Sequence, residues 1–134
     1  MQLLLVRHAL PLRSEIGEGS DPELADAGWD QARRLPDALA RFEVSRLVSS
    51  PQRRARQTAE PVAAAFGLPV DIDDRMAEYD RGMSHYVPLE EVRADRPGDW
   101  ARMAQGQLPD TVDADAFTAR VRCALRDIVA AAHH

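Results

Sequence analysis

Short apolar segments alternate with helical patterns over the first 72 residues of this chain, and this alternation constrains its fold more than any other feature. Residues 2–7, 45–49 and 70–72 each predict a short strand, the first of them buried. Helices are predicted in the two intervals. Because strands joined by helical crossovers pair in parallel, this order predicts an α/β fold with a mostly parallel sheet.

Proline and glycine set the predicted helix ends. Apolar residues recur at helical spacing over 32–42, where Pro36 predicts a kink or a restart. Pro51 favours the start of the next helix, whose apolar stripe runs over 55–66 and which Gly67 should end.

The second half of the chain has a different organisation. Residues 80–112 contain several prolines and glycines and predict a lid or insertion over the site, with short helices at 89–94 and around 100–103. A long helix with one apolar face is predicted from about 114 to 132. We expect residues 1–134 to form a single domain, which is large enough to bury roughly two thirds of its surface.

Composition limits the compartment and the partners. The single Cys123 excludes an internal disulfide and a cysteine-based zinc site. A net charge of −5 argues against general nucleic-acid binding. The N-terminal apolar run is too short for a signal peptide or a membrane span. We therefore expect a cytoplasmic protein that binds neither nucleic acid nor membrane.

Arg7 and His8 directly follow the first predicted strand. Parallel α/β sheets place their active residues at the carboxyl ends of the strands, so this pair falls where a site is expected. A neutral imidazole nitrogen is a good nucleophile near pH 7, and a guanidinium matches phosphate oxygens. The pair points to phosphoryl chemistry, although a hydrogen-bonded loop histidine remains the alternative.

An arginine cluster follows the second predicted strand. All 17 basic residues are arginine, and Arg53, Arg54 and Arg56 lie together in an acidic chain. Such a cluster suggests capture of a small anion. A solvated helix face with intrahelical ion pairs is the alternative interpretation.

Four blocks of sequence resemble the histidine phosphatase superfamily, the phosphoglycerate mutase-like family. They are LLLVRHALP at 3–11, LADAGWDQA at 24–32, SSPQRRARQTAEPVA at 49–63 and MAEYDRG at 76–82, in the order and spacing of that family. The resemblance covers residues 1 to about 82. It implies a three-layer fold in which helices cover both faces of the central sheet.

The resemblance also implies roles for four residues. His8 would be phosphorylated in a covalent intermediate, and Arg7 and Arg54 would bind the phosphoryl oxygens. Glu78 would give a proton to the leaving oxygen and then activate water, which requires a carboxyl kept partly protonated by burial or nearby negative charge. A surface glutamate in an acidic loop is the alternative for Glu78. Neither a metal nor a cofactor is implied.

Other positions stay open or depart from the family. Arg53 and Arg56 would be flanking surface charges, with a register on Arg53 as the alternative to Arg54. His85 is either a loop residue or a substrate contact. The family's second catalytic histidine, on a later strand, has no counterpart before the chain ends at His133–His134. We therefore expect a C-terminally incomplete domain with uncovered apolar helix faces.

The expected function is a metal-independent phosphatase that hydrolyses a small phosphomonoester through phosphorylated His8. Phosphoryl transfer of the phosphoglycerate mutase type is one alternative. A non-catalytic phosphate-binding protein or inactive fragment is another. The expected partner is a small phosphorylated substrate, and a homodimer is left open.

Overall fold

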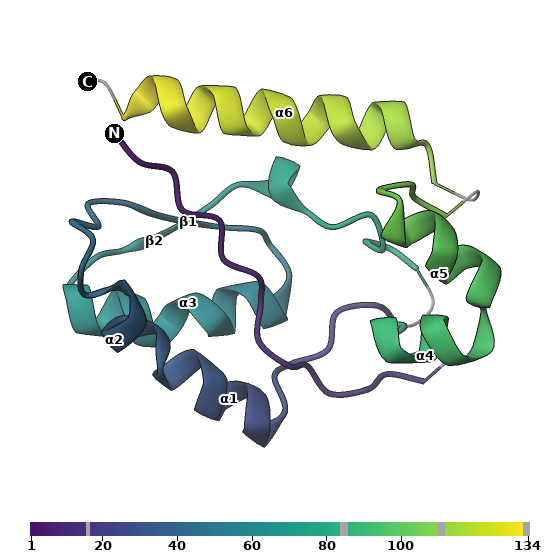
Figure 1. Ribbon diagram of the computed structural model, residues 1–134. Coiled ribbons are helices and arrows are strands. Elements are labelled where there is room, and N and C mark those ends of the chain that lie inside the picture. The colour runs from purple at the N-terminus through teal and green to yellow at the C-terminus, as the bar shows by residue number, and fades with distance from the viewer. Residues whose placement is uncertain (16, 84–85, 110–111, 133–134) are drawn as a thin grey trace.

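The computed structural model of this chain describes residues 1–134 except 16, 84–85, 110–111 and 133–134 (Figure 1). Its elements, in chain order, are α1 (Asp26–Arg33), α2 (Leu35–Leu39), β1 (Leu47–Ser49), α3 (Arg53–Phe66), β2 (Val70–Ile72), the 3₁₀-helix η1 (Asp74–Met76), α4 (Leu89–Asp95), α5 (Pro97–Ala104) and α6 (Ala114–Ala131). The predicted positions of the two later strands and of α3, α4, α5 and α6 agree with these bounds to within a few residues, whereas α1 begins before the apolar pattern at 32–42 and η1 was not predicted.

The sheet lies between two layers of helices. β1 and β2 pair in parallel, with Leu47 opposite Val70 and Ser49 opposite Ile72. Helices α1, α2 and α3 lie on one side of these strands, and α6 lies on the other (Figure 1). The predicted α/β class, with a parallel sheet and helices on both faces, is confirmed.

The strand predicted at residues 2–7 is wrong. This segment takes no part in a described strand, and the side chains of Leu3, Leu5 and Val6 are 46%, 73% and 51% exposed. An apolar run becomes a strand only when a neighbouring strand completes its backbone hydrogen bonds, and β1 pairs with β2 alone in the described sheet. The predicted burial of this apolar run is wrong as well, because residues 2–7 are all exposed.

A wide cleft lies beside this unpaired segment. It has a volume of about 1230 Å³ and is lined by residues 1–8, by β1 and by Leu125, Ile128 and Val129 of α6. The apolar face predicted for the long helix therefore borders a cleft and is only half-buried. In Figure 1 the amino-terminal segment runs past β1, with its start near the carboxyl end of α6.

Local sequence explains the helix ends. Pro36 stands in the first turn of α2, where its missing N–H is not needed, so the predicted restart occurs there. Gly67 ends α3 in the left-handed region, at φ +64°, and Leu68 N–H donates to the Ala63 carbonyl. Asp113 caps α6 by accepting from the amide of Ala116 at 3.0 Å.

A small cluster fixes the segment that follows His8. Ala9, Leu24 and Ala32 are buried together, and Trp29 packs against them. A Cβ atom on Gly28 would lie 2.0 Å from the carbonyl oxygen of Leu10. Only glycine lets α1 approach this segment so closely.

Helices α4 and α5 lie beyond the carboxyl ends of β1 and β2 (Figure 1). They belong to the segment 80–112, whose role as a lid stays a prediction. No helix in the described part of the chain is both long and apolar enough to cross a membrane.

Candidate active site

The imidazole of His8 is oriented by its own neighbour. Its Nδ1–H donates to the carbonyl oxygen of Ala9 at 2.8 Å, which leaves Nε2 as the nitrogen with a free lone pair. Burial lowers the pKa of His8 below its ordinary value of 6.5, and the charges of Arg54 and Arg7 lower it further, against the opposing effect of the Ala9 hydrogen bond. The ring is therefore neutral near pH 7, as a nucleophile requires.

Thr58 connects His8 to α3. Its hydroxyl accepts from the amide of Ala9 at 2.9 Å and donates to the carbonyl of Arg54 at 2.6 Å. The threonine lies one helical turn after Arg54, so one side chain fixes the peptide after His8 relative to the helix that carries this arginine.

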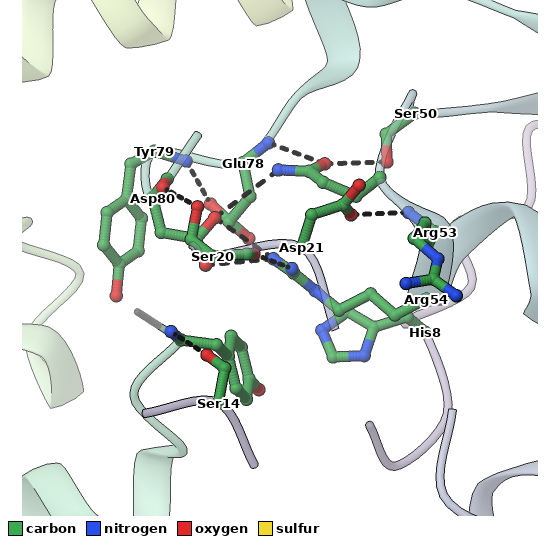
Figure 2. A network of polar contacts seen from close by, with 12 residues as sticks. His8, Ser14, Ser20, Asp21, Ser50, Arg53, Arg54, Glu78, Tyr79 and Asp80 are labelled. Carbon is green, nitrogen blue, oxygen red and sulfur yellow. Dashed lines mark hydrogen bonds and ion pairs between the residues drawn. The ribbon is translucent and has the colours of Figure 1, made fainter. Parts of the chain in front are cut away.

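Arg54 is the most deeply buried cation of the described structure, at 1% exposure. Nη1 donates to the carbonyl of Ser20 at 2.9 Å, and Nη2 donates to both carboxylate oxygens of Asp80, at 3.1 and 3.2 Å (Figure 2). The guanidinium carbon lies 4.8 Å from the centre of the Tyr86 ring. The Nε of Arg54 is the one buried side-chain nitrogen or oxygen atom in the described residues that lacks a hydrogen-bond partner.

The two arginines beside Arg54 face away from this network. Arg53 and Arg56 are exposed, and Arg53 forms an ion pair with Glu23 at 2.8 Å. The structure thus places Arg54, and not Arg53, beside His8. This is the register that the sequence favoured.

Glu78 lies at the border of the same cleft, and it is exposed. Its carboxylate accepts from the amide of Tyr79 at 3.0 Å, and its charge raises the pKa of His8, so the two side chains are within electrostatic reach. The burial that a proton donor was expected to need is not provided by the described residues.

Arg7 also lines the cleft and is exposed. Its charge contributes to the low pKa of His8, so it stands near the imidazole without being held as Arg54 is held. The structure therefore brings His8 and Arg54 together and leaves Arg7 and Glu78 at the rim. His85 lies outside the described residues.

Sequence reasoning missed several residues of the network, among them Gln52, Asp80 and Tyr86. Gln52 accepts from the Ser50 hydroxyl at 3.0 Å and from the Glu78 amide at 3.1 Å, and its amide nitrogen is 3.4 Å from Asp80. Burial raises the pKa of Asp80 above its ordinary value, and Arg54 opposes this effect. Asp80 has no predicted role, since nothing in the local sequence marks it as buried.

Tyr86 brings the segment after residue 80 to the site. Its ring meets the His8 ring edge to face, with the ring centres 6.5 Å apart. Its backbone amide donates to the hydroxyl of Ser14 at 2.6 Å. One aromatic ring therefore contacts both the imidazole and the guanidinium, and it forms a wall of the site.

The described residues contain no group of three or more histidine, cysteine, aspartate or glutamate side chains arranged to hold a metal ion.

The sequence profile of the histidine phosphatase superfamily (branch 1) matches residues 3–134, and the chain belongs to this family. Phosphoserine phosphatase 1 of Hydrogenobacter thermophilus is 35% identical over 108 residues, which are 78% of this chain and 51% of that protein. A probable phosphoglycerate mutase of Enterobacter sp. (strain 638) is 27% identical over 135 residues, 95% of this chain and 62% of the relative.

A solved structure shows the same fold. The complex of mycobacterial glucosyl-3-phosphoglycerate phosphatase with inorganic phosphate superimposes with a TM-score of 0.63 and 30% identity, over 92% of this chain and 60% of the other. The chain thus spans between half and two thirds of the length of these relatives.

Proposed function

We propose that this chain carries the phosphoryl-transfer site of a phosphatase that hydrolyses a small phosphomonoester through phosphorylated His8. One observation carries the proposal. Nδ1 of His8 donates to the Ala9 carbonyl, which leaves Nε2 free, and the imidazole lies beside a buried arginine whose Nε–H has no partner among the described residues. Burial also holds the pKa of His8 below its ordinary value. A nucleophile next to an anion donor is the minimum that attack on a phosphoryl group requires.

The proposed reaction has two steps. Nε2 of His8 forms a bond to phosphorus while the bond from phosphorus to the leaving oxygen breaks, and Glu78 gives that oxygen its proton. Glu78, now ionised, takes a proton from water, whose oxygen attacks the phosphohistidine and releases inorganic phosphate. Arg54 and Arg7 balance the negative charge of the phosphoryl oxygens in both steps.

Several relatives support hydrolysis. The proteins similar to this chain include a phosphoserine phosphatase and a glucosyl-3-phosphoglycerate phosphatase, the latter solved with inorganic phosphate. Both substrates named there are small phosphomonoesters. We assign the same broad class to this chain and leave the individual substrate open.

Phosphate release from a small phosphomonoester tests the proposal. Substitutions of the adjacent residues Arg54 and Arg53 provide the test variant and its matched control. We expect His8→Ala and Arg54→Ala to lose nearly all activity. Arg53→Ala should retain it, because Arg53 is exposed and paired with Glu23. Unchanged turnover in His8→Ala would contradict the proposal.

Two alternatives each rest on one observation. Mutase chemistry is favoured by the phosphoglycerate mutase relative, and interconversion of 3- and 2-phosphoglycerate, with and without bisphosphoglycerate priming, distinguishes it. Binding without turnover is favoured by the exposure of Glu78, because the described residues do not bury the carboxyl that would have to act as the proton donor. Calorimetric titration with phosphate, together with an activity assay, identifies binding without turnover: heat of binding would be measured while no phosphate is released.

A further inference from the structure

We propose that Asp80 is a positioning residue, which orients the Arg54 guanidinium so that Nε–H is the donor kept for a phosphoryl oxygen. This inference rests on the proposed function and assigns a task to a carboxylate that the reaction scheme does not use.

Two nitrogens of the Arg54 guanidinium have hydrogen-bond partners, and the third has none among the described residues. Nη1 is engaged by the Ser20 carbonyl at 2.9 Å and Nη2 by the Asp80 carboxylate at 3.1 and 3.2 Å. Nε is buried and unpartnered. A buried donor without an acceptor costs free energy, and an acceptor that arrives from outside would remove this cost. An anionic oxygen is the acceptor that a guanidinium N–H prefers.

Two further residues contact Asp80 and restrict the position of its carboxylate. The Ser20 hydroxyl donates to the Asp80 backbone carbonyl at 2.5 Å, and Gln52 approaches its carboxylate at 3.4 Å. Figure 2 shows the loop at Ser20, the residues after Glu78 and the side chain of Arg54 meeting at this point. Two segments distant in sequence are therefore joined to α3 through one buried ion pair.

Tyr86 supplies the remaining constraint. Its ring lies 4.8 Å from the guanidinium carbon, in a cation–π contact. The ring limits tilting of the guanidinium, while Ser20 and Asp80 limit its rotation within the plane. Asp80 does not itself bind substrate in this account, because its two oxygens face Arg54 and a second anion beside a phosphoryl group would repel it.

The ion pair between Arg54 and Asp80 also affects the binding of an anionic substrate. Asp80 balances the charge of the buried Arg54 guanidinium. Arg54 can therefore stay buried when no phosphoryl group is bound. Loss of the Asp80 charge should leave Arg54 free to turn toward solvent, which moves Nε away from its acceptor. Activity should fall even though no substrate contact is deleted.

The test is a double-substitution cycle on the chain, measured as phosphate release and as affinity for orthovanadate. Asp80→Asn should lower kcat/KM by roughly 10- to 100-fold, as expected when a charge-assisted hydrogen bond is lost. Asp80→Glu should recover part of this loss. In the Arg54→Lys background the same Asp80→Asn substitution should have little further effect, because Asp80 acts through Arg54.

Asp71→Asn is the matched control, since Asp71 forms an exposed ion pair with Arg46 on the sheet and should leave both readouts unchanged. If Asp80→Asn does not fold, the cycle is run with Asp80→Glu, which keeps the charge and displaces the carboxylate. Wild-type activity that survives either Asp80 substitution, or additive effects with Arg54→Lys, would overturn the inference and leave the proposed function standing. A wild-type chain that neither releases phosphate nor binds vanadate would overturn both.

Discussion

The hydroxyl of Thr58 accepts a hydrogen bond from the amide of Ala9 at 2.9 Å, across 49 positions of sequence. The same hydroxyl donates to the carbonyl of Arg54. The peptide that orients the His8 ring and the helix turn that carries Arg54 are thus joined by a single oxygen atom. A change at Thr58 should therefore disturb the nucleophile and the anion donor together.

We expect Thr58→Val to destabilise the fold by about 1–3 kcal/mol, because it preserves shape but leaves a buried N–H without an acceptor. Thr58→Ser should retain most stability, and Thr118→Val on the exposed side of α6 is the control. Urea unfolding gives the free energies. Equal unfolding midpoints for Thr58→Val and wild type would contradict the assigned hydrogen bond.

Substitution of Gly28 tests the close approach of α1 to the segment after His8. Alanine there would place a Cβ atom 2.0 Å from the Leu10 carbonyl oxygen, so a backbone segment must move. We expect Gly28→Ala to cost about 1–3 kcal/mol, in the range of overpacked cores, although alanine is the better helix former. Gly98→Ala in α5 meets no atom within 4 Å and is the control. A more stable Gly28→Ala protein would show that α1 lies farther away.

Leu5 distinguishes the predicted buried strand from the observed exposed segment. Its side chain is 73% exposed, so Leu5→Asn should change stability by no more than about 0.5 kcal/mol. Val62→Ala, at a position 3% exposed, should cost about 1 kcal/mol or more as a buried reference. If Leu5→Asn proves as costly as Val62→Ala in urea unfolding, residues 2–7 are buried in solution.

The pKa of His8 predicts a pH dependence with a definite sign. Burial holds this pKa below 6.5 in the folded chain, so the unfolded chain binds the proton more readily. The stability linked to His8 is fully present above pH 6.5 and is lost as pH falls through the lower folded value. Urea unfolding of wild type and His8→Asn at about pH 7.5 and about pH 5.5 measures this, and the substitution should reduce the slope. An unchanged slope would place the proton uptake elsewhere.

The regular elements could be predicted because their signals are local. Pro36 and Gly67 mark helix ends by their own backbone preferences, and α6 shows its apolar face over 18 residues. The segment 2–7 could not be predicted in the same way, since a strand depends on a partner and the apolar run specifies none. Its leucines line the same cleft as the apolar residues of α6.

The candidate site likewise contains residues that could be predicted from the sequence and residues that could not. His8 and Arg54 stand in blocks whose order and spacing resemble the family, so their approach was expected. Asp80 and Tyr86 act through tertiary contacts with Arg54, and no spacing in the sequence reports such contacts. The exposure of Glu78 is likewise a property of the folded loop.

The most direct test of the central claim is the covalent state of the chain during turnover. Rapid mixing with a small phosphomonoester, an alkaline quench that preserves phosphohistidine and intact mass spectrometry should reveal one added phosphoryl group. Peptide mapping should locate it on His8, and His8→Asn should lack it. Phosphate release by a chain that never carries this group, or carries it on another residue, would contradict the account.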